Sequence, residues 1–206
     1  MTTGRRARSS VIALLAAAAV GCSASAPARF YSLDSTATLD GPPLTQVSVM
    51  VGPVTVPAAV DQPQFVVQVA PNRVEVDEFN RWVAPLNDSI ARAVAGDLAS
   101  QLGTPDVAPA PLVSLHPTYS VAIDVLRFES IRGQAAVVEA VWAVHRTPGG
   151  AARTGHTLAR EAVQGNGFDA LAAAHSRALA IVSADIATAI RTDASNNRKV
   201  AKRRAE

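Results

Sequence analysis

The chain has 206 residues, of which 49% are hydrophobic and only 4% aromatic, so its core must be built mainly from Val, Leu, Ile and Ala. This length is ample for one well-packed domain and short for two. The net charge of +2 is unevenly distributed, because residues 22–190 carry ten arginines against fifteen acids while both ends are basic. The positive total therefore gives no support to nucleic-acid binding.

The first 21 residues have the pattern of a bacterial export signal. Three arginines precede an apolar run over residues 11–20, which is too short to span a bilayer and typical of the apolar core of a signal peptide. Small residues then lead to Cys22, as in the lipobox of bacterial lipoproteins. The sequence predicts a lipoprotein signal peptide over residues 1–21 and acylation of Cys22.

Cysteine usage supports lipidation of this residue. Cys22 is the only cysteine of the chain, so it has no disulfide to form within an exported protein. The alternative is an ordinary secretory signal cut near Ala24 or Ala26, with Cys22 discarded. If acylated, Cys22 would anchor the protein firmly, with residues 22–28 as a short tether. Ser23 follows the cysteine, which by similarity to sorted lipoproteins implies delivery to the outer membrane.

The mature chain predicts two rounds of strands, each followed by an amphipathic helix. The strands of the first round are expected over residues 29–33, 47–51, 65–69 and 74–76. Its helix starts at Pro85, ends at Gly103 and carries one apolar stripe, made of Leu86, Ile90, Val94, Leu98 and Leu102.

The second round follows a proline-rich loop over residues 103–117. Its strands are expected over residues 119–130, 136–146 and 154–163, with a bulge near Val125 in the first of them. The second helix has apolar residues from Phe168 to Ile190 at three- and four-residue spacing, and Asp169 can cap its start. The polar, basic segment 192–206 is expected to be a disordered tail.

These elements predict an α+β fold in which the two amphipathic helices pack on a mostly antiparallel sheet. A single domain is expected over residues 29–191.

Short segments spread over the mature chain resemble one known family, the ABC-type transport auxiliary lipoproteins of the PqiC-like or YmbA-like group. They are Phe30-Tyr31-Ser32-Leu33, Val51-Gly52-Pro53-Val54, Val60 to Val66, Asn72-Arg73, Arg81-Trp82, Pro85-Leu86, Ile123 to Glu129, Trp142 and Ala173 to Ala180. Their order along nearly the whole mature domain is more specific than any one of them. Gln62 stands where the family usually has arginine.

The resemblance implies a non-enzymatic lipoprotein of the outer membrane, facing the periplasm of a Gram-negative bacterium and held in lipid by acylated Cys22. It implies two partners, a periplasmic MCE-domain protein and an ABC-type or related protein of the inner membrane. Such systems move phospholipids or other hydrophobic molecules between the two membranes. In this role the lipoprotein docks the MCE assembly at the outer membrane, and a homo-oligomer is compatible with it.

Arg81 and Trp82 are the candidate partner-binding residues, because arginine and tryptophan are common at interface hot spots. The alternative places Trp82 in the core under the first helix, with Arg81 packed on it. Asn72 and Arg73 are a second candidate pair, and the alternative for them is a turn.

No metal or cofactor is expected. The four histidines show no metal-ligand spacing, and His175 is expected to be a half-buried residue of the apolar helix face. No nucleophile elbow surrounds Ser176, and there is no Walker A or dinucleotide-binding motif.

Two other functions remain open at this point. A stand-alone lipoprotein that binds a hydrophobic ligand requires an apolar cavity in the isolated domain. A lipoprotein hydrolase requires Asp124, His175 or Ser176 to converge in one cleft.

Overall fold

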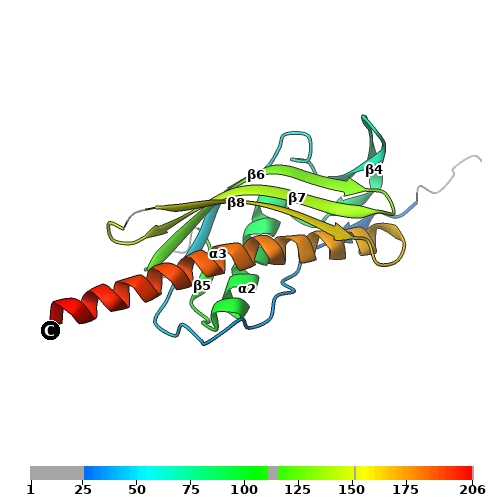
Figure 1. Ribbon diagram of the computed structural model, residues 1–206. Coiled ribbons are helices and arrows are strands. Elements are labelled where there is room, and N and C mark those ends of the chain that lie inside the picture. Colours follow the sequence, from blue (N-terminus) through cyan, green and yellow to red (C-terminus); the bar gives the residue numbers. More distant parts are fainter. Residues whose placement is uncertain (1–25, 111–115, 151, 206) are drawn as a thin grey trace, which may run out of the picture.

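The computed structural model describes residues 26–110, 116–150 and 152–205, whose strands form one sheet with two helices on the same face (Figure 1). The predicted signal peptide and Cys22 lie outside the described residues. The strands are β1 (Arg29–Tyr31), β2 (Val49–Thr55), β3 (Gln64–Ala70), β4 (Arg73–Trp82), β5 (Val107–Pro109), β6 (Tyr119–Ile131), β7 (Ala135–Arg146) and β8 (Arg153–Ala162). The helices are α2 (Leu86–Leu102) and α3 (Gly167–Ala205).

β6 is the strand around which the sheet is organised. It pairs with β7 along its whole length, and β8 continues the sheet beyond β7. On the other side, β2 pairs with the first half of β6 and β3 with its last two residues. β5 borders β2, whereas β4 borders β3 and carries β1 on its last three residues.

The sheet is mixed, which corrects the prediction of a mostly antiparallel sheet. Among the described strands, the pairs β1–β4, β2–β5, β2–β6 and β3–β6 are parallel, and the pairs β3–β4, β6–β7 and β7–β8 are antiparallel. Alternating apolar residues identify a strand but do not show which strand it pairs with. Here α2 lies between β2 and its partner β6 in the sequence, as in the crossover connection of a parallel pair. The predicted bulge is confirmed by a register shift between Val125 and Arg127.

α2 has the boundaries that its sequence predicts. Pro85 precedes its first turn, and Gly103 ends it in the left-handed conformation with φ 65°, its N–H bonding to the carbonyl of Ala99 at 3.0 Å. All five residues of the predicted stripe are at most 2% exposed.

α3 continues fourteen residues beyond Arg191, through Ala205, where a disordered tail was expected. Alanine, lysine and arginine in this segment favour helix without any apolar face. Asn197 adds side-chain support, because its amide donates to the carbonyl and the carboxylate of Asp193 at 3.0 and 2.8 Å. In Figure 1 this red end of α3 runs on past the sheet.

α3 is also the one described helix long and apolar enough to cross a membrane, judged by length and composition alone. However, 67% of its most apolar window is buried within the protein. This is the pattern of a core helix.

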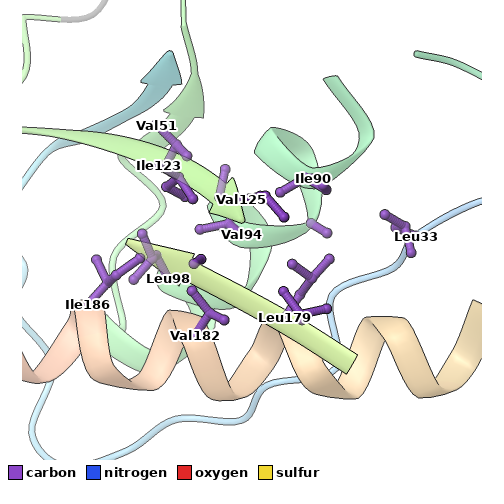
Figure 2. Close-up of a cluster of buried hydrophobic side chains, with 14 of the residues drawn as sticks. Leu33, Val51, Ile90, Val94, Leu98, Ile123, Val125, Leu179, Val182 and Ile186 are labelled. Atoms are coloured by element: carbon purple, nitrogen blue, oxygen red, sulfur yellow. The ribbon is translucent and has the colours of Figure 1, made fainter. Parts of the chain in front are cut away.

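The core lies between the helices and the sheet, as Figure 2 shows for ten labelled residues. Leucine and isoleucine of both helices meet valine and isoleucine of β2 and β6 there. Trp142 contributes from β7, with Val138, Ala140 and Val144 on the same face.

The segment after β1, residues 32–46, crosses the helix layer, and we call it the N-terminal strap. Its backbone is tied to α2 by Asp97, whose Oδ1 accepts hydrogen bonds from the N–H groups of Thr36 and Ala37 at 2.9 and 3.0 Å. Farther along, Arg191 of α3 donates to the carbonyl of Pro42 at 2.6 Å. The strap therefore joins the entry of the chain to both helices.

Candidate functional site

Trp82, a candidate for partner binding, lies in the core. Only 5% of its surface is exposed, and its ring stacks on Phe65 with 4.0 Å between the ring centroids. Phe128 and His175 approach the same indole edge-to-face at 6.0 and 6.1 Å. The geometry favours the interpretation of Trp82 as a core residue.

His175 is fully buried where half-burial was expected. Its ring lies flat on Phe128 at 3.9 Å, and its Nε2 is 2.8 Å from the hydroxyl of Ser130. Burial lowers the pKa of His175 from 6.5 to about 3, so the ring is neutral in the physiological range. Its Nδ1 has no hydrogen-bond partner among the described residues.

The three residues required for a hydrolase do not converge. Ser176 donates to the carbonyl of Ala172 in its own helix at 3.1 Å, and its hydroxyl accepts the N–H of Asp34 at the same distance. Asp124 lies on the sheet face away from the helices, where it accepts a hydrogen bond from the hydroxyl of Thr55 at 2.8 Å. The structure therefore gives no support to the hydrolase hypothesis.

Pro71 and Asn72 form the turn between β3 and β4, as one of the two interpretations predicted for Asn72, and Arg73 is the first residue of β4. Asn72 has φ 60°, a conformation that asparagine tolerates better than most residues. Arg73 and Arg81 both keep partly or fully exposed side chains, and Arg81 contacts Glu78 at 3.6 Å. Partner contact by these residues stays a prediction.

Two hollows of the described structure bear on the ligand-binding hypothesis. One, of about 480 Å³, is an open groove between residues 43–47, at the end of the strap, and the last turns of α3, with Arg146 and Arg198 on its walls. Tyr119 also lines it, and burial together with a hydrogen bond to Asp193 raises the pKa of Tyr119 to about 12. An apolar pocket of about 240 Å³ lies beside Phe168 and Leu171.

Neither cavity is the enclosed apolar chamber that a stand-alone lipid-binding domain requires. Nor do the described residues contain a group of three or more His, Cys, Asp or Glu side chains that could hold a metal ion. On the outer face of the sheet, His156 pairs instead with Glu139 at 2.8 Å.

Sequence reasoning missed two features. Asp97 of α2 is completely buried, although it is a charged residue in an otherwise apolar region. The residues around it gave no sign of the strap that it binds. In addition, Val74 and Val76 lie on a predicted strand, but their exposure, 61% and 46%, was not predicted.

Residues 31–187 match the model of a protein family described as ABC-type transport auxiliary lipoprotein component. The chain belongs to this family. The match covers every helix and strand of the auxiliary lipoprotein from the end of β1 to the buried part of α3.

Two solved structures share the fold of this auxiliary lipoprotein. One, described as an uncharacterized protein, has 23% sequence identity and a TM-score of 0.65, with 80% of this chain and 99% of that chain covered. The other, from Xanthomonas campestris, has 22% identity and a TM-score of 0.64, with 84% and 99% covered. No curated protein matches the sequence.

Proposed function

We propose that this auxiliary lipoprotein is a non-enzymatic component of an MCE/ABC-type lipid transport system, anchored in the outer membrane through acylated Cys22. In this role its periplasmic domain docks the MCE assembly at the outer membrane. The observation that carries the proposal is the family match over residues 31–187, combined with a single cysteine directly after the predicted export signal. Ser23 supports sorting to the outer membrane.

The domain itself suits docking better than ligand capture. Its described interior is filled by side chains, the groove beside α3 is open, and the buried Asp97 and His175 make structural hydrogen bonds. A role as a connecting surface needs a rigid body and an anchor, and both are provided by the proposed arrangement.

The test is a pull-down of the full-length protein from detergent-solubilised membranes after mild crosslinking, with mass spectrometry of the captured proteins. We expect an MCE-domain protein among them, and we expect fractionation to place the wild type, but not Cys22→Ser, in the outer membrane. Capture of lipid without any such protein would instead support the stand-alone ligand-binding role.

A charge-reversal variant tests the predicted contact residues in the same experiment. Arg73→Glu combined with Arg81→Glu changes two exposed guanidinium groups without touching the core, and Arg160→Glu on β8 is the matched control. Loss of the MCE partner from the double variant alone would assign the contact to β4. Trp82→Ala is unsuitable here, because it would remove a core side chain.

A further inference from the structure

Large exposed hydrophobic side chains are concentrated along β1 and β4. Half of the ten such side chains in the described structure belong to these strands or to the residue after β4, and they are Phe30, Val74, Val76, Phe79 and Val83. Their exposed fractions run from 45% for Phe79 to 62% for Phe30. Isolated exposed hydrophobics need no explanation, but a gathered set marks a contact surface.

The register of β1 places Phe30 on the sheet face away from the helices. Tyr31 lies beside Trp82 in the parallel β1–β4 pair, and both side chains are buried in the core. Successive side chains of a strand point to opposite faces, so Phe30 and Val83 point away from the core.

The register of β4 gives the same answer for its two valines. Val74 and Val76 lie opposite Gln68 and Val66 of β3, which alternate with core residues of that strand. Both valines therefore share the outer face with Phe30 and Val83. We call these four residues, with Phe79 in the adjoining bend, the β1–β4 apolar face.

The position of the predicted lipid anchor decides what covers this face. Only six residues separate Cys22 from Arg29, the first residue of β1. Even a fully extended chain of this length spans at most about 25 Å. An acylated Cys22 thus keeps β1 and the paired end of β4 beside the bilayer, while the C-terminal end of α3 lies at the opposite end of the molecule (Figure 1).

We infer that the β1–β4 apolar face rests on the membrane, with its side chains entering the interfacial layer of the bilayer. This inference rests on the acylation of Cys22 in the proposed function. The charged residues nearby compensate one another, since Arg132 pairs with Glu75 at 3.0 Å and Arg81 with Glu78 at 3.6 Å. The face therefore meets lipid headgroups without a strong repulsive charge.

Contact is limited to the interface by the backbone of β4. Residues 73–77 pair with β3 on one edge only, and in the described structure no strand occupies their other edge. Free N–H and C=O groups need water or headgroup partners, so they cannot enter the hydrocarbon. The side chains lie at the surface of the bilayer in the manner of an interfacial anchor.

Depth-dependent quenching tests the inference with the full-length acylated protein. Val76→Cys and Phe79→Cys are labelled with an environment-sensitive fluorophore and reconstituted into vesicles of phosphatidylethanolamine and phosphatidylglycerol that contain nitroxide-labelled lipid. Leu158→Cys on β8 and Val200→Cys on α3 are the controls, because the native side chains are similarly exposed, at 57% and 49%. We expect several-fold stronger quenching and blue-shifted emission at positions 76 and 79.

Equal quenching at all four positions of a protein whose Cys22 is acylated by mass spectrometry would overturn this inference alone. An unmodified Cys22 would overturn both the anchoring in the proposed function and this inference. The fluorescence of the labels at positions 76 and 79 could also stay unchanged with vesicles but shift to shorter wavelength when the captured partner is added. In that case the face is a protein interface and the inference is wrong.

Discussion

Single residues show how closely this domain is packed around its few polar and aromatic groups. Trp142 of β7 lies directly across from Gly155 of β8, and its indole occupies the space that a side chain at position 155 would need. The indole N–H donates to the hydroxyl of Thr157 at 3.0 Å, which in turn donates to Asp185 of α3. This chain of contacts fixes the tryptophan in one orientation.

Gly155→Ala tests this arrangement. A Cβ at position 155 would overlap the Trp142 ring, which is held by its hydrogen bond and cannot move freely. We expect the free energy of unfolding, measured in urea, to fall by about 1 to 3 kcal/mol. Thr154→Ala, at the neighbouring exposed position of β8, is the control and should change it by less than about 0.5 kcal/mol. Equal effects of both variants would contradict the steric argument.

The lowered pKa of His175 predicts that the folded protein loses stability in acid. Its pKa in the folded protein, about 3, lies below the unfolded value of 6.5, so the unfolded chain binds a proton first as the pH falls. The stabilising contribution is therefore complete above pH 6.5 and is lost as the pH falls toward 3. From pH 7 to pH 5 this residue alone lowers the free energy of unfolding by about 2 kcal/mol.

His175→Gln is the comparison, since glutamine does not titrate and can still reach the Ser130 hydroxyl. Its free energy of unfolding should depend less on pH over the same interval. Parallel curves for wild type and variant would show that His175 does not govern the acid sensitivity.

At the scale of elements, the N-terminal strap is attached by one buried carboxylate. Asp97 accepts hydrogen bonds from the backbone N–H groups of Thr36 and Ala37 and from the hydroxyls of Ser35 and Ser183, and so joins the strap to α2 and α3. Burial raises the pKa of Asp97 above 3.8 in spite of these bonds. The charge is therefore more costly than the neutral carboxyl in this position.

Asp97→Asn should keep the strap in place. The amide oxygen can accept the three bonds of the strap, and the amide nitrogen can donate to Ser183, whose own hydroxyl donates to Leu179 at 2.9 Å. We expect stability within about 1 kcal/mol of wild type, whereas Asp97→Ala should lose roughly 2 to 4 kcal/mol because buried donors lose their acceptor. Urea unfolding measures both, and equal losses would mean that the carboxylate charge is essential.

The pH dependence gives a second measure of the same residue. Because the folded-state pKa of Asp97 is raised, the folded protein keeps its proton longer as the pH rises, and stability falls as the pH increases from 3.8 through the raised value. This trend is opposite to that of His175. It should disappear in the Asp97→Asn variant.

For the whole molecule, the sequence predicted what depends on local pattern and failed where distant segments meet. α2 was correct at both ends because Pro85 and Gly103 each act on the helix turn beside them. The parallel pairing of β2 with β6 was missed because it depends on a long crossover. The α+β class was correct in spite of this, since it follows from the number and type of elements.

The candidate residues follow the same division. The Asn72 turn is a local property and was predicted, whereas the burial of His175 depends on Phe128 and Ser130, more than forty residues away. The polar end of α3 was assigned to a tail because its composition lacks an apolar face. Helix propensity and continuity with the buried turns extend the helix there instead.

The continuous α3 also sets a dimension. Thirty-nine residues at about 1.5 Å each make a rod roughly 58 Å long, which starts near the end of the molecule that carries β1 and β4 and finishes in a basic segment at the far end. If the protein is anchored near β1, that basic tip lies at the end of the molecule farthest from the anchor. Length and direction are coupled in such a rod, because each added residue lengthens the helix by about 1.5 Å and rotates its end by about 100°.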